Sequence, residues 1–328
     1  MGVVSINERL TRHVPAGLGD VAVLVPCRNE EHAIAKVVSD FRAALPNATV
    51  YVYDNNSSDR TIEVADQAGA VVRAETHQGK GHVVRRMFSD IEAEIYVLVD
   101  GDATYDAFSA PQMIEILMEE QLDMVVATRV NCAEAAYRRG HRAGNRLLTT
   151  LVTLIFGRAF TDMLSGYRVF SRRFVKSFTG LSRGFEVETE LTIHALQLEL
   201  PVKEMETAYY ARPIGSASKL STWHDGFRIL WTIFQLYRAE RPLQLFGSAG
   251  LLLTIVSIVL AIPIFFTYFE NGQVPRLPTA VLSTGLMLLG FLSMAVGLIL
   301  DTVTRGRHET KLIAYHAFRA PGEQRRNS

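Results

Sequence analysis

Two long uncharged stretches near the end of the sequence constrain this chain more than any other feature. Residues 242–269 and 277–300 contain no Asp, Glu, Lys or Arg. Each stretch exceeds the roughly 20 residues that an α-helix needs to cross a hydrocarbon core of about 30 Å. Neither is N-terminal, so neither is a cleavable signal peptide. We therefore predict two membrane-spanning helices, rather than a buried hairpin inside a water-soluble domain.

The charges beside these stretches predict how the helices are oriented. The connecting loop, Glu270–Arg276, is short, so the second helix returns the chain to the side where the first began. That loop holds one basic residue, whereas the outer flanks carry Arg238, Arg241, Arg305, Arg307 and Lys311. The positive-inside rule then puts both flanks, and the large N-terminal part, in the cytoplasm of a multi-pass protein of the cell (inner) membrane.

The rest of the composition narrows the class of protein. The chain of 328 residues has 34 basic and 34 acidic side chains, so no global positive field attracts nucleic acid. Its two cysteines, Cys27 and Cys132, are too few for a disulfide framework, and we expect free thiols in a reducing compartment. The composition therefore leaves a membrane and small molecules as the expected partners.

Residues 21–128 alternate between short apolar runs and amphipathic segments. The apolar runs predict strands at Val21–Val25, Thr49–Tyr53, Ala70–Arg73, Ile95–Val99 and Met124–Thr128. Helices are predicted over about 31–45, up to Gln67, after Gly81 and over about 110–121. This alternation is typical of an α/β domain with a mostly parallel sheet, in which ligands bind beyond the carboxyl ends of the strands. Polar clusters stand at those ends: Arg28–Glu31, Asp54–Asp59, Asp100–Asp102 and Arg129.

The sharpest of these clusters is Asp100-Gly101-Asp102, directly after the strand IYVLV. Two carboxylates at the end of a buried strand repel each other unless a cation joins them. A hard divalent ion takes one or two carboxylates together with substrate phosphate oxygens. We therefore predict that Asp100 and Asp102 bind Mg²⁺ or Mn²⁺, the alternative being an Asp-Gly turn in which Asp102 caps the next helix.

Two further polar segments are candidate binding loops. Asp54 and Asn55 offer acceptors for a base or a ribose, whereas Asp59 and the adjacent serines are expected to cap the following helix. The loop Gly79–Gly81 contributes one cation, Lys80, as another donor-binding candidate.

Basic residues dominate the polar positions of the middle segment. A site that joins a diphosphate to an anionic acceptor needs cations, and Arg can bind phosphate through two hydrogen bonds. Arg129, at the end of its strand, is the strongest candidate for phosphate binding. Arg138, Arg142 and Arg168 are candidates for binding the acceptor phosphate, and Arg212 and Lys219 are two further cations, on either side of Gly215-Ser216-Ala217-Ser218.

Two helical segments are expected near the membrane. Trp223–Arg241 mixes aromatic, aliphatic and basic residues directly before the first span, which favours an amphipathic helix at the interface. The apolar helix expected over Asn145–Phe160 is too short to span, and is either core or an in-plane membrane helix.

These motifs together resemble the inverting glycosyltransferases of family 2, which have the GT-A fold. VLVPCRNEE, VYDNNSSDRT, HQGKG, LVDGDAT, VVATR, DMLSGYRVF and RPIGSASKL stand in the family's order over about residues 20–225. The likeness is strongest to the dolichyl-phosphate mannose synthases and polyprenyl-phosphate glycosyltransferases. It implies a Rossmann-like sheet, a nucleotide-sugar donor, Mg²⁺ or Mn²⁺, and a polyprenyl phosphate acceptor.

The resemblance also implies roles for individual residues. Pro26, Arg28 and Glu30 would contact the nucleotide beside Asp54 and Asn55. Asp100, Gly101 and Asp102 fall on the family's D-x-D, whose last Asp binds metal. Arg129 would hold phosphate, and Arg212 and Lys219 match the basic pair of a loop that closes over the donor. The acceptor phosphate would attack the anomeric carbon in line, with inversion and without a general base.

The expected organisation runs from an N-terminal extension (1–20) to a GT-A domain (21–222), an interfacial helix (223–241), a two-helix membrane hairpin (242–302) and a cytoplasmic tail (303–328). The oligomeric state stays open, a homo-oligomer included. One alternative is transfer to a sugar hydroxyl, for which Glu186, Glu188 or Glu190 would be the base. Another is a catalytically silent membrane scaffold that binds nucleotide sugars.

Overall fold

The computed structural model describes residues 20–130, 160–180, 187–211, 234–235 and 237–322. The chain divides into two units, Met1–Asp225 together with Lys311–Ser328, and Gly226–Thr310. We describe each by itself. The first contains the α/β domain, and the second contains the apolar helices.

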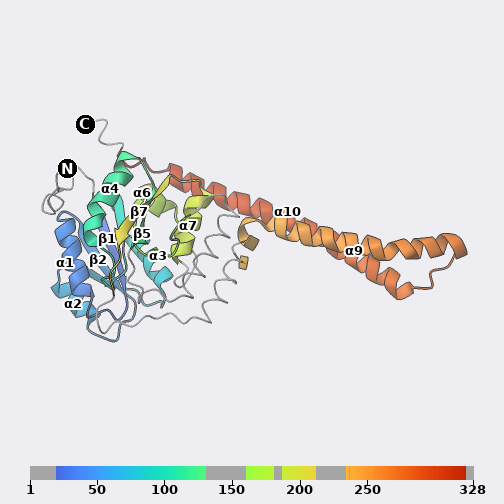
Figure 1. Ribbon diagram of the computed structural model, residues 1–328, viewed down its shortest axis with the longest axis horizontal. Helices are drawn as coiled ribbons and strands as arrows, with labels where there is room; N and C mark the ends of the chain where they lie inside the picture. Colours follow the sequence, from blue (N-terminus) through green and yellow to red (C-terminus); the bar gives the residue numbers. More distant parts are fainter. Residues whose placement is uncertain (1–19, 131–159, 181–186, 212–233, 236, 323–328) are drawn as a thin grey trace, which may run out of the picture. The chain divides into compact units, whose positions relative to one another are not determined.

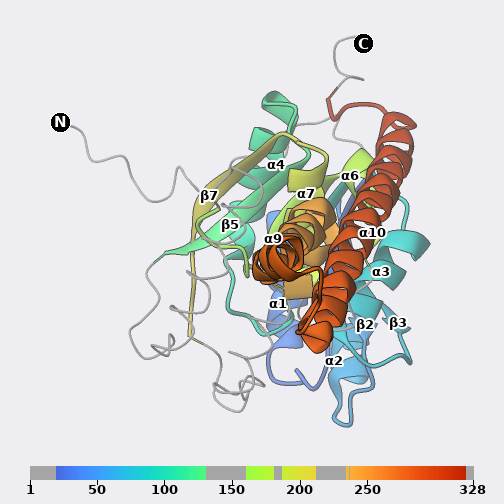
Figure 2. The same cartoon turned by 90° about the vertical axis from the view of Figure 1, so that its right-hand side faces the viewer.

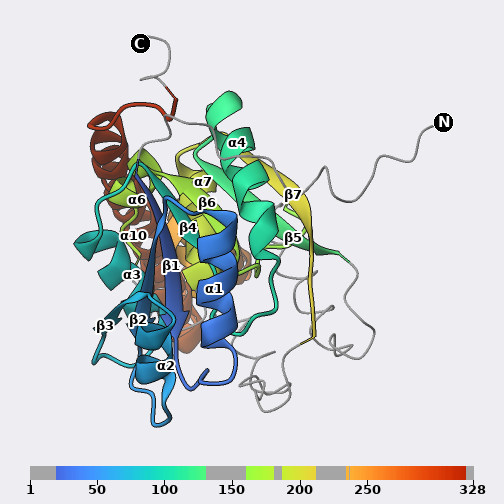
Figure 3. The same cartoon turned by 90° about the vertical axis from the view of Figure 1, so that its left-hand side faces the viewer.

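One mixed sheet forms the centre of the first unit, in the strand order β3-β2-β1-β4-β6-β5-β7 (Figure 3). The strands are β1 (Val21–Cys27), β2 (Thr49–Asp54), β3 (Val71–Ala74), β4 (Ile95–Leu98), β5 (Met124–Val130), β6 (Arg168–Ser171) and β7 (Val202–Ala208). Only the pairings with β6 are antiparallel, and the remaining pairings are parallel. Figure 2 shows β5 and β7 side by side at one edge of the sheet.

Helices cover both faces of this sheet (Figure 1). The helices are α1 (Ile34–Ala44), α2 (Thr61–Gln67), α3 (Lys80–Asp90), the 3₁₀ turn η2 (Ala107–Ser109), α4 (Ala110–Glu119), α6 (Arg172–Ser177) and α7 (Val187–Gln197). On one face, α1 and α4 bury apolar side chains such as Phe41 and Leu117 against the odd-numbered residues of β1. On the other face, Phe88 of α3 packs edge-on against Tyr96 and Phe170 of the sheet. The predicted α/β fold with a mostly parallel sheet is confirmed.

The second unit contains two long apolar helices, α9 (Pro242–Asn271) and α10 (Leu277–His316). Both have the length and the composition of membrane-crossing helices, as predicted. Small residues let them approach: a Cβ added at Gly250 would lie 2.6 Å from the carbonyl oxygen of Gly290. Ser257 Oγ donates to the Ser283 carbonyl at 2.7 Å, and Ser283 Oγ donates to the Ser257 carbonyl at 3.0 Å. The large apolar side chains of both helices remain exposed, as lipid-facing side chains would be.

The last turn of α10 and the residues after it belong to the first unit. Their main anchor is Asp123, a fully buried residue just before β5. Its Oδ2 accepts from the Tyr315 hydroxyl at 2.8 Å and from Arg173 Nη2 at 2.9 Å. The Arg173 guanidinium also lies 4.7 Å from the centre of the Tyr315 ring. α10 therefore continues well past residue 302, where the sequence predicted that the hairpin would end.

Candidate functional site

The carboxyl ends of β1, β2 and β4 bring the predicted polar clusters together. Cys27 at the end of β1 is in register with Asp54 at the end of β2. On the other side of β1, Val99 N donates to the Leu24 carbonyl, which aligns β4 so that Asp100 follows at the same edge. The sheet therefore places the two predicted binding segments next to each other, as parallel strands require.

The thiol of Cys27 is buried at this edge, within the electrostatic range of four carboxylates. Burial raises the pKa of the Cys27 thiol, and the negative charges of Glu30, Asp54, Asp100 and Asp102 raise it further. All four carboxylates therefore act on one sulfur atom. Cys27 is a free thiol, as predicted, whereas Cys132 lies outside the described residues. The sulfur also explains Gly101, because a Cβ there would lie 2.4 Å from Sγ.

Asp102 is held in one orientation by its own turn. It is buried, and its Oδ1 accepts from Thr104 N at 3.2 Å and from Thr104 Oγ1 at 2.6 Å. Between them, Ala103 adopts the left-handed conformation with φ of 57°. A non-glycine residue in this region is strained, and such strain is common at functional sites. The turn therefore fixes the Asp102 carboxylate before any ligand arrives.

Asp100 is paired with a cation of the chain itself. Lys80, the first residue of α3, bonds both to Asp100 Oδ1 and to Glu188 Oε1 of α7. Burial alone would lower the pKa of Lys80, but the charges of Asp100 and Glu188 outweigh it and raise that pKa above its ordinary value. On the other side of Asp100, a Cβ added at Gly166 would lie 2.3 Å from Oδ2. Lys80 therefore holds Asp100 on one side, and the absence of a side chain at Gly166 leaves room for the carboxylate on another.

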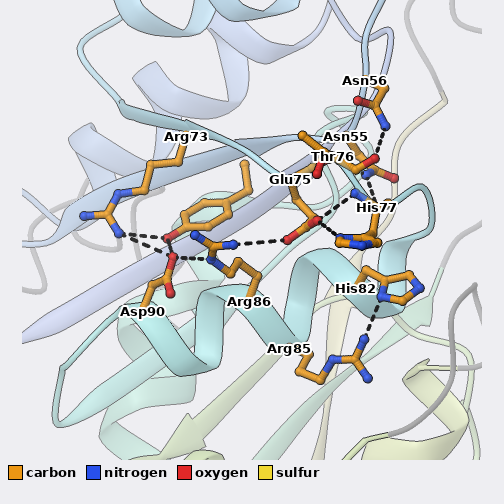
Figure 4. Close-up of polar contacts among 11 residues, drawn as sticks. Asn55, Asn56, Arg73, Glu75, Thr76, His77, His82, Arg85, Arg86 and Asp90 are labelled. Atoms are coloured by element: carbon orange, nitrogen blue, oxygen red, sulfur yellow. Dashed lines mark hydrogen bonds and ion pairs between the residues drawn. The ribbon is translucent and has the colours of Figure 1, made fainter.

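Hydrogen bonds join the predicted nucleotide-binding loop after β2 to the loop after β3 (Figure 4). Asn55 Nδ2 donates to the carbonyls of Glu75 and His77, both at 2.9 Å, and its Oδ1 accepts from Gly79 N at 2.7 Å. The Asn55 side chain therefore fixes the loop that leads to Lys80, and no hydrogen-bonding atom of its amide group is left without a partner.

Asp54 differs from its neighbour. Its Oδ2 accepts from Ser57 N at 3.0 Å, while its buried Oδ1 has no hydrogen-bond partner among the described residues. A buried acceptor without a donor is costly, so this oxygen is suited to a ligand N–H or O–H group.

The residues after β1 contact the loop after β2. Asn29 N donates to Ser57 Oγ and Glu30 N donates to Thr61 Oγ1, at 2.8 and 2.9 Å. Arg28 is exposed, and with the Gln78 amide turned to accept, its guanidinium lies 2.6 and 2.8 Å from the amide oxygen. Pro26, half-buried in β1, stands beside them. All three residues predicted to contact the nucleotide, Pro26, Arg28 and Glu30, therefore border this edge.

The expected capping by Asp59 and the serines is only partly correct. α2 begins at Thr61, and its N-cap, Arg60, makes no side-chain cap. Asp59 Oδ1 does accept from Thr61 N at 3.0 Å, but Ser57 bonds to Asn29 instead of to the helix. Ser57 makes this contact with a residue that is distant in sequence, so local spacing does not reveal it.

Arg129 lies at the same edge of the sheet but is not a solitary cation. Its Nε and Nη2 donate to the two carboxylate oxygens of Asp162 at 2.6 and 2.7 Å. The guanidinium also lies 5.5 Å from the centre of the Tyr209 ring. Asp162 was not among the predicted residues, although it is the first residue of the motif DMLSGYRVF.

Arg168 corrects one prediction. Its side chain is fully buried, and its guanidinium donates to the Ser165 and Met163 carbonyls and to Thr192 Oγ1 at 2.6–3.0 Å. Burial lowers the pKa of Arg168 to about 10. An enclosed guanidinium that is bonded to the chain cannot meet an acceptor phosphate, so Arg168 is a structural residue.

Four predicted residues, Arg138, Arg142, Arg212 and Lys219, lie outside the described residues, as do most of the segments 145–160 and 223–241. The chain nevertheless leaves β7 close to the D-G-D turn. Tyr210 N donates to the Thr104 carbonyl at 2.8 Å, and the backbones of Tyr209 and Tyr105 form an isolated antiparallel β-bridge.

The carboxylates at this sheet edge would hold a hard divalent cation only together with oxygen atoms of a bound ligand. Within the described ranges, no group of three or more His, Cys, Asp and Glu is arranged to hold a metal ion. Mg²⁺ commonly takes one or two carboxylates and completes its shell with phosphate oxygens and water. The fixed Asp102 and the surplus of negative charge around Cys27 fit that mode of binding.

A sheet of this order, with helices on both faces and a D-G-D turn after its central strand, defines a glycosyltransferase of the GT-A fold. The comparisons with known proteins name the family. The pattern of Glycosyl transferase family 2 matches residues 22–178. Glycosyltransferase AglJ of Haloferax volcanii is 34% identical over 285 residues, which are 86% of this chain and 93% of AglJ. The chain belongs to glycosyltransferase family 2.

Other relatives and structures agree with this family. An uncharacterised protein of Shigella flexneri is 54% identical over 153 residues, 47% of this chain and 94% of its own. A dolichyl-phosphate hexose transferase of H. volcanii is 27% identical over 68% of this chain and 96% of its own. Glucosyl-3-phosphoglycerate synthase from Mycobacterium tuberculosis, solved with Mn²⁺ and UDP, shares the fold with a TM-score of 0.54 at 20% identity, over 71% of this chain and 85% of its own.

Proposed function

We propose that this glycosyltransferase moves a sugar from a GDP- or UDP-sugar to a polyprenyl phosphate, dolichyl or undecaprenyl, with inversion at the anomeric carbon. One observation carries the proposal: a buried Asp102, oriented by Thr104 in the turn after β4, in a chain that also has two helices long and apolar enough to cross a membrane. The first feature suits a metal-bound diphosphate. The second suits an acceptor that cannot leave the bilayer.

On the donor side, the chain would hold a nucleotide between the loops after β1 and β2. The unpartnered Asp54 Oδ1 would accept from the base or the ribose, with Arg28, Glu30 and Pro26 around it. Asn55 would act indirectly, because its amide fixes the loop that carries Lys80. Arg212 and Lys219 would close over the diphosphate, from a segment that begins beside Thr104.

A divalent cation, Mg²⁺ or Mn²⁺, held by Asp102 with Asp100 nearby would stabilise the charge that gathers on the departing nucleoside diphosphate. Asp102 is already oriented by Thr104, so little reorganisation would be needed. At an effective dielectric constant near 20, one unit charge pair at about 4 Å contributes about 4 kcal/mol, or roughly a thousandfold in rate.

On the acceptor side, a phosphate is already ionised and needs no general base. Arg129 would steer it from the edge of β5, with Arg138 and Arg142 as further cations. Asp162 holds the Arg129 guanidinium in one plane at the carboxyl end of β5, and an oriented guanidinium suits the recognition of a phosphate. The relative named dolichyl-phosphate hexose transferase supports this class of acceptor.

The same proposal includes an orientation in the membrane. Basic residues gather before α9 and beyond the apolar part of α10, and the loop between the helices has only Arg276. By the positive-inside rule the catalytic unit faces the cytoplasm, where nucleotide sugars are made.

Transfer to a sugar hydroxyl is the second candidate, because α7 carries glutamates. A hydroxyl needs a base within hydrogen-bond reach. Glu188 is buried and bonded to Lys80, and Glu190 is half-buried on the same helix, whereas Glu186 lies outside the described residues. The ion pair with Lys80 occupies one carboxylate oxygen of Glu188, which lowers the weight of this candidate.

The test is a panel of UDP- and GDP-sugars with radiolabelled sugar, offered to the full-length protein in detergent with Mn²⁺. One arm supplies a polyprenyl phosphate, and the other supplies an oligosaccharide. Label that enters an organic-extractable lipid in the first arm supports the proposal. Label that enters only the oligosaccharide supports the second candidate, and equal transfer in excess chelator contradicts the metal.

A further inference from the structure

Glu188 has no role in the proposed function, yet it is bonded to Lys80, which is also bonded to Asp100 of the D-G-D turn. It is buried on α7, and its Oε1 bonds to Lys80. Its second oxygen, Oε2, has no hydrogen-bond partner among the described residues. Burial raises the pKa of this carboxyl above its ordinary value. Such a group is costly in a helix that packs in the interior, and it therefore needs an explanation.

The Lys80 ammonium joins three segments that are distant in sequence. Lys80 begins α3, Asp100 follows β4, and Glu188 lies 108 residues from Lys80, on α7. The side chains differ in exposure: Asp100 is 30% exposed, Lys80 10% and Glu188 7%. Asp100 is therefore on the open side of the ammonium, and Glu188 is on the inner side.

The ammonium has one N–H group more than these two bonds use. Lysine carries three donors, and the carboxylates of Asp100 and Glu188 take two. A long, flexible lysine gains a defined position only when its head is fixed by more than one partner, because each partner removes rotamer freedom. Two fixed acceptors also set the direction of the third N–H group.

We infer that Glu188 is a positioning residue that holds the Lys80 ammonium beside Asp100, where its third N–H group binds a diphosphate oxygen of the donor. The inference rests on the proposed function, and it adds a second cation to the same diphosphate. Asp102 serves the divalent ion, whereas Asp100 serves Lys80. Glu188 touches neither the donor nor the metal and acts through Lys80 alone.

A purely structural ion pair would not need this arrangement. Replacing a buried ion pair by apolar side chains of similar volume is often neutral or stabilising, so stability alone does not account for Glu188. Three charged groups that meet at the site, with Asp100 packed too closely against Gly166 to admit a side chain there, account for it better.

Two substitutions separate position from charge. Glu188→Asp keeps the negative charge but withdraws the carboxylate by one methylene. Glu188→Gln removes the charge but keeps an acceptor oxygen in reach. We expect Glu188→Asp to weaken the binding of UDP or GDP in the presence of Mn²⁺ about tenfold, and Glu188→Gln only about threefold, in calorimetric titrations of the full-length protein. An electrostatic role would reverse this order.

The matched control is Glu199→Asp, an exposed glutamate just beyond the same helix, with unchanged affinity expected. Lys80→Met supplies the background: there, Glu188→Asp should change the affinity by less than about twofold, because a residue that acts through Lys80 has nothing left to position. The Tm of each variant, measured in parallel, shows that the folded protein is being titrated.

The outcomes are distinct for the two proposals. Additive effects in the Lys80→Met background, the reversed order of the two Glu188 variants, or unchanged affinity in both would overturn the role of Glu188. If the expected pattern appears but no sugar reaches any lipid acceptor, the inference stands and the proposed reaction fails. If the wild-type protein binds neither diphosphate, both fail.

Discussion

The sheet edge and the helix hairpin both bury polar groups, but they treat them in opposite ways. In the hairpin, Ser257 and Ser283 exchange hydrogen bonds, and no charge is involved. At the sheet edge, the charges of four carboxylates act on Cys27, and Asp54 and Glu188 each keep a buried oxygen without a hydrogen-bond partner in the described part of the chain. Satisfied polar groups stabilise a structure, whereas charges left in surplus need a ligand. The two regions thus separate anchoring from chemistry.

The largest effect should come from removing charge at the sheet edge while keeping its shape. Asp102→Asn retains an acceptor for Thr104 but loses the carboxylate. We expect sugar transfer to fall about a thousandfold, measured as label in lipid under saturating Mn²⁺. Asp66→Asn, the same change at an exposed position of α2, is the control. Transfer at the wild-type rate in Asp102→Asn would remove the metal from the proposal.

A smaller loss should follow from crowding the same region without changing any charge. A methyl group at Gly166 would lie 2.3 Å from Asp100 Oδ2, so Gly166→Ala must displace that carboxylate. We expect kcat/KM to drop about 100-fold, because misplacement by about 1 Å is enough for such a loss. At Gly285, in α10, an added Cβ meets nothing within 4 Å. Equal activity losses in Gly166→Ala and Gly285→Ala would show that the effect is not local to the site.

One buried polar side chain, His194, belongs to neither of the two compared groups and allows a test by pH. His194 is buried on α7, and its Nδ1 has no partner among the described residues. Burial lowers its pKa to about 3. Between pH 3 and about 6.5 the unfolded chain therefore binds more protons than the folded one, so stability falls as the pH falls through this window, by up to about 1.4 kcal/mol per pH unit.

The measurement is the Tm of the protein in detergent between pH 7 and pH 4.5, compared with His194→Leu. The variant should lose less stability on acidification, since it has no imidazole to protonate. Identical slopes for the two proteins would mean that other groups control the acid sensitivity.

The smallest effect should come from the hairpin. Ser257→Ala removes one hydroxyl of the reciprocal pair, and hydrogen bonds between membrane helices average about 0.6 kcal/mol. We expect a destabilisation of that size in a titration with sodium dodecyl sulfate followed by circular dichroism, with unchanged transfer. A substantial loss of transfer in Ser257→Ala would break the separation of anchoring from chemistry.

Local patterns predicted the framework well, because apolar runs and turns are local properties. The strand expected at Val21–Val25 is β1, Val21–Cys27, and the helix expected over about 31–45 is α1, Ile34–Ala44. The position of the polar clusters at the carboxyl ends of the strands followed from the expected parallel topology, whereas the order of the strands was not predicted. β7 was not predicted, since its sequence VKEMETA has few apolar residues and lies at an edge of the sheet.

Tertiary contacts were beyond the reach of the pattern. Nothing in the spacing links Lys80 to Glu188, or Arg129 to Asp162, because these pairs meet only when distant segments fold together. The role predicted for Arg168 was wrong for the same reason. Its motif Ser165-Gly166-Tyr167-Arg168 does not reveal that β6 is an inner strand, which buries the guanidinium.

The Tyr315 hydroxyl has a practical consequence for anyone who wants the enzyme without its lipid anchor. Ending the chain before residue 242 would remove the apolar helices, but it would also take away the Tyr315 hydroxyl that donates to the fully buried Asp123 and the ring beneath Arg173. The trimmed protein would then expose a surface that the intact chain covers with its own tail. A soluble version should instead delete only the hairpin and rejoin residues 311–322 through a short Gly-Ser linker.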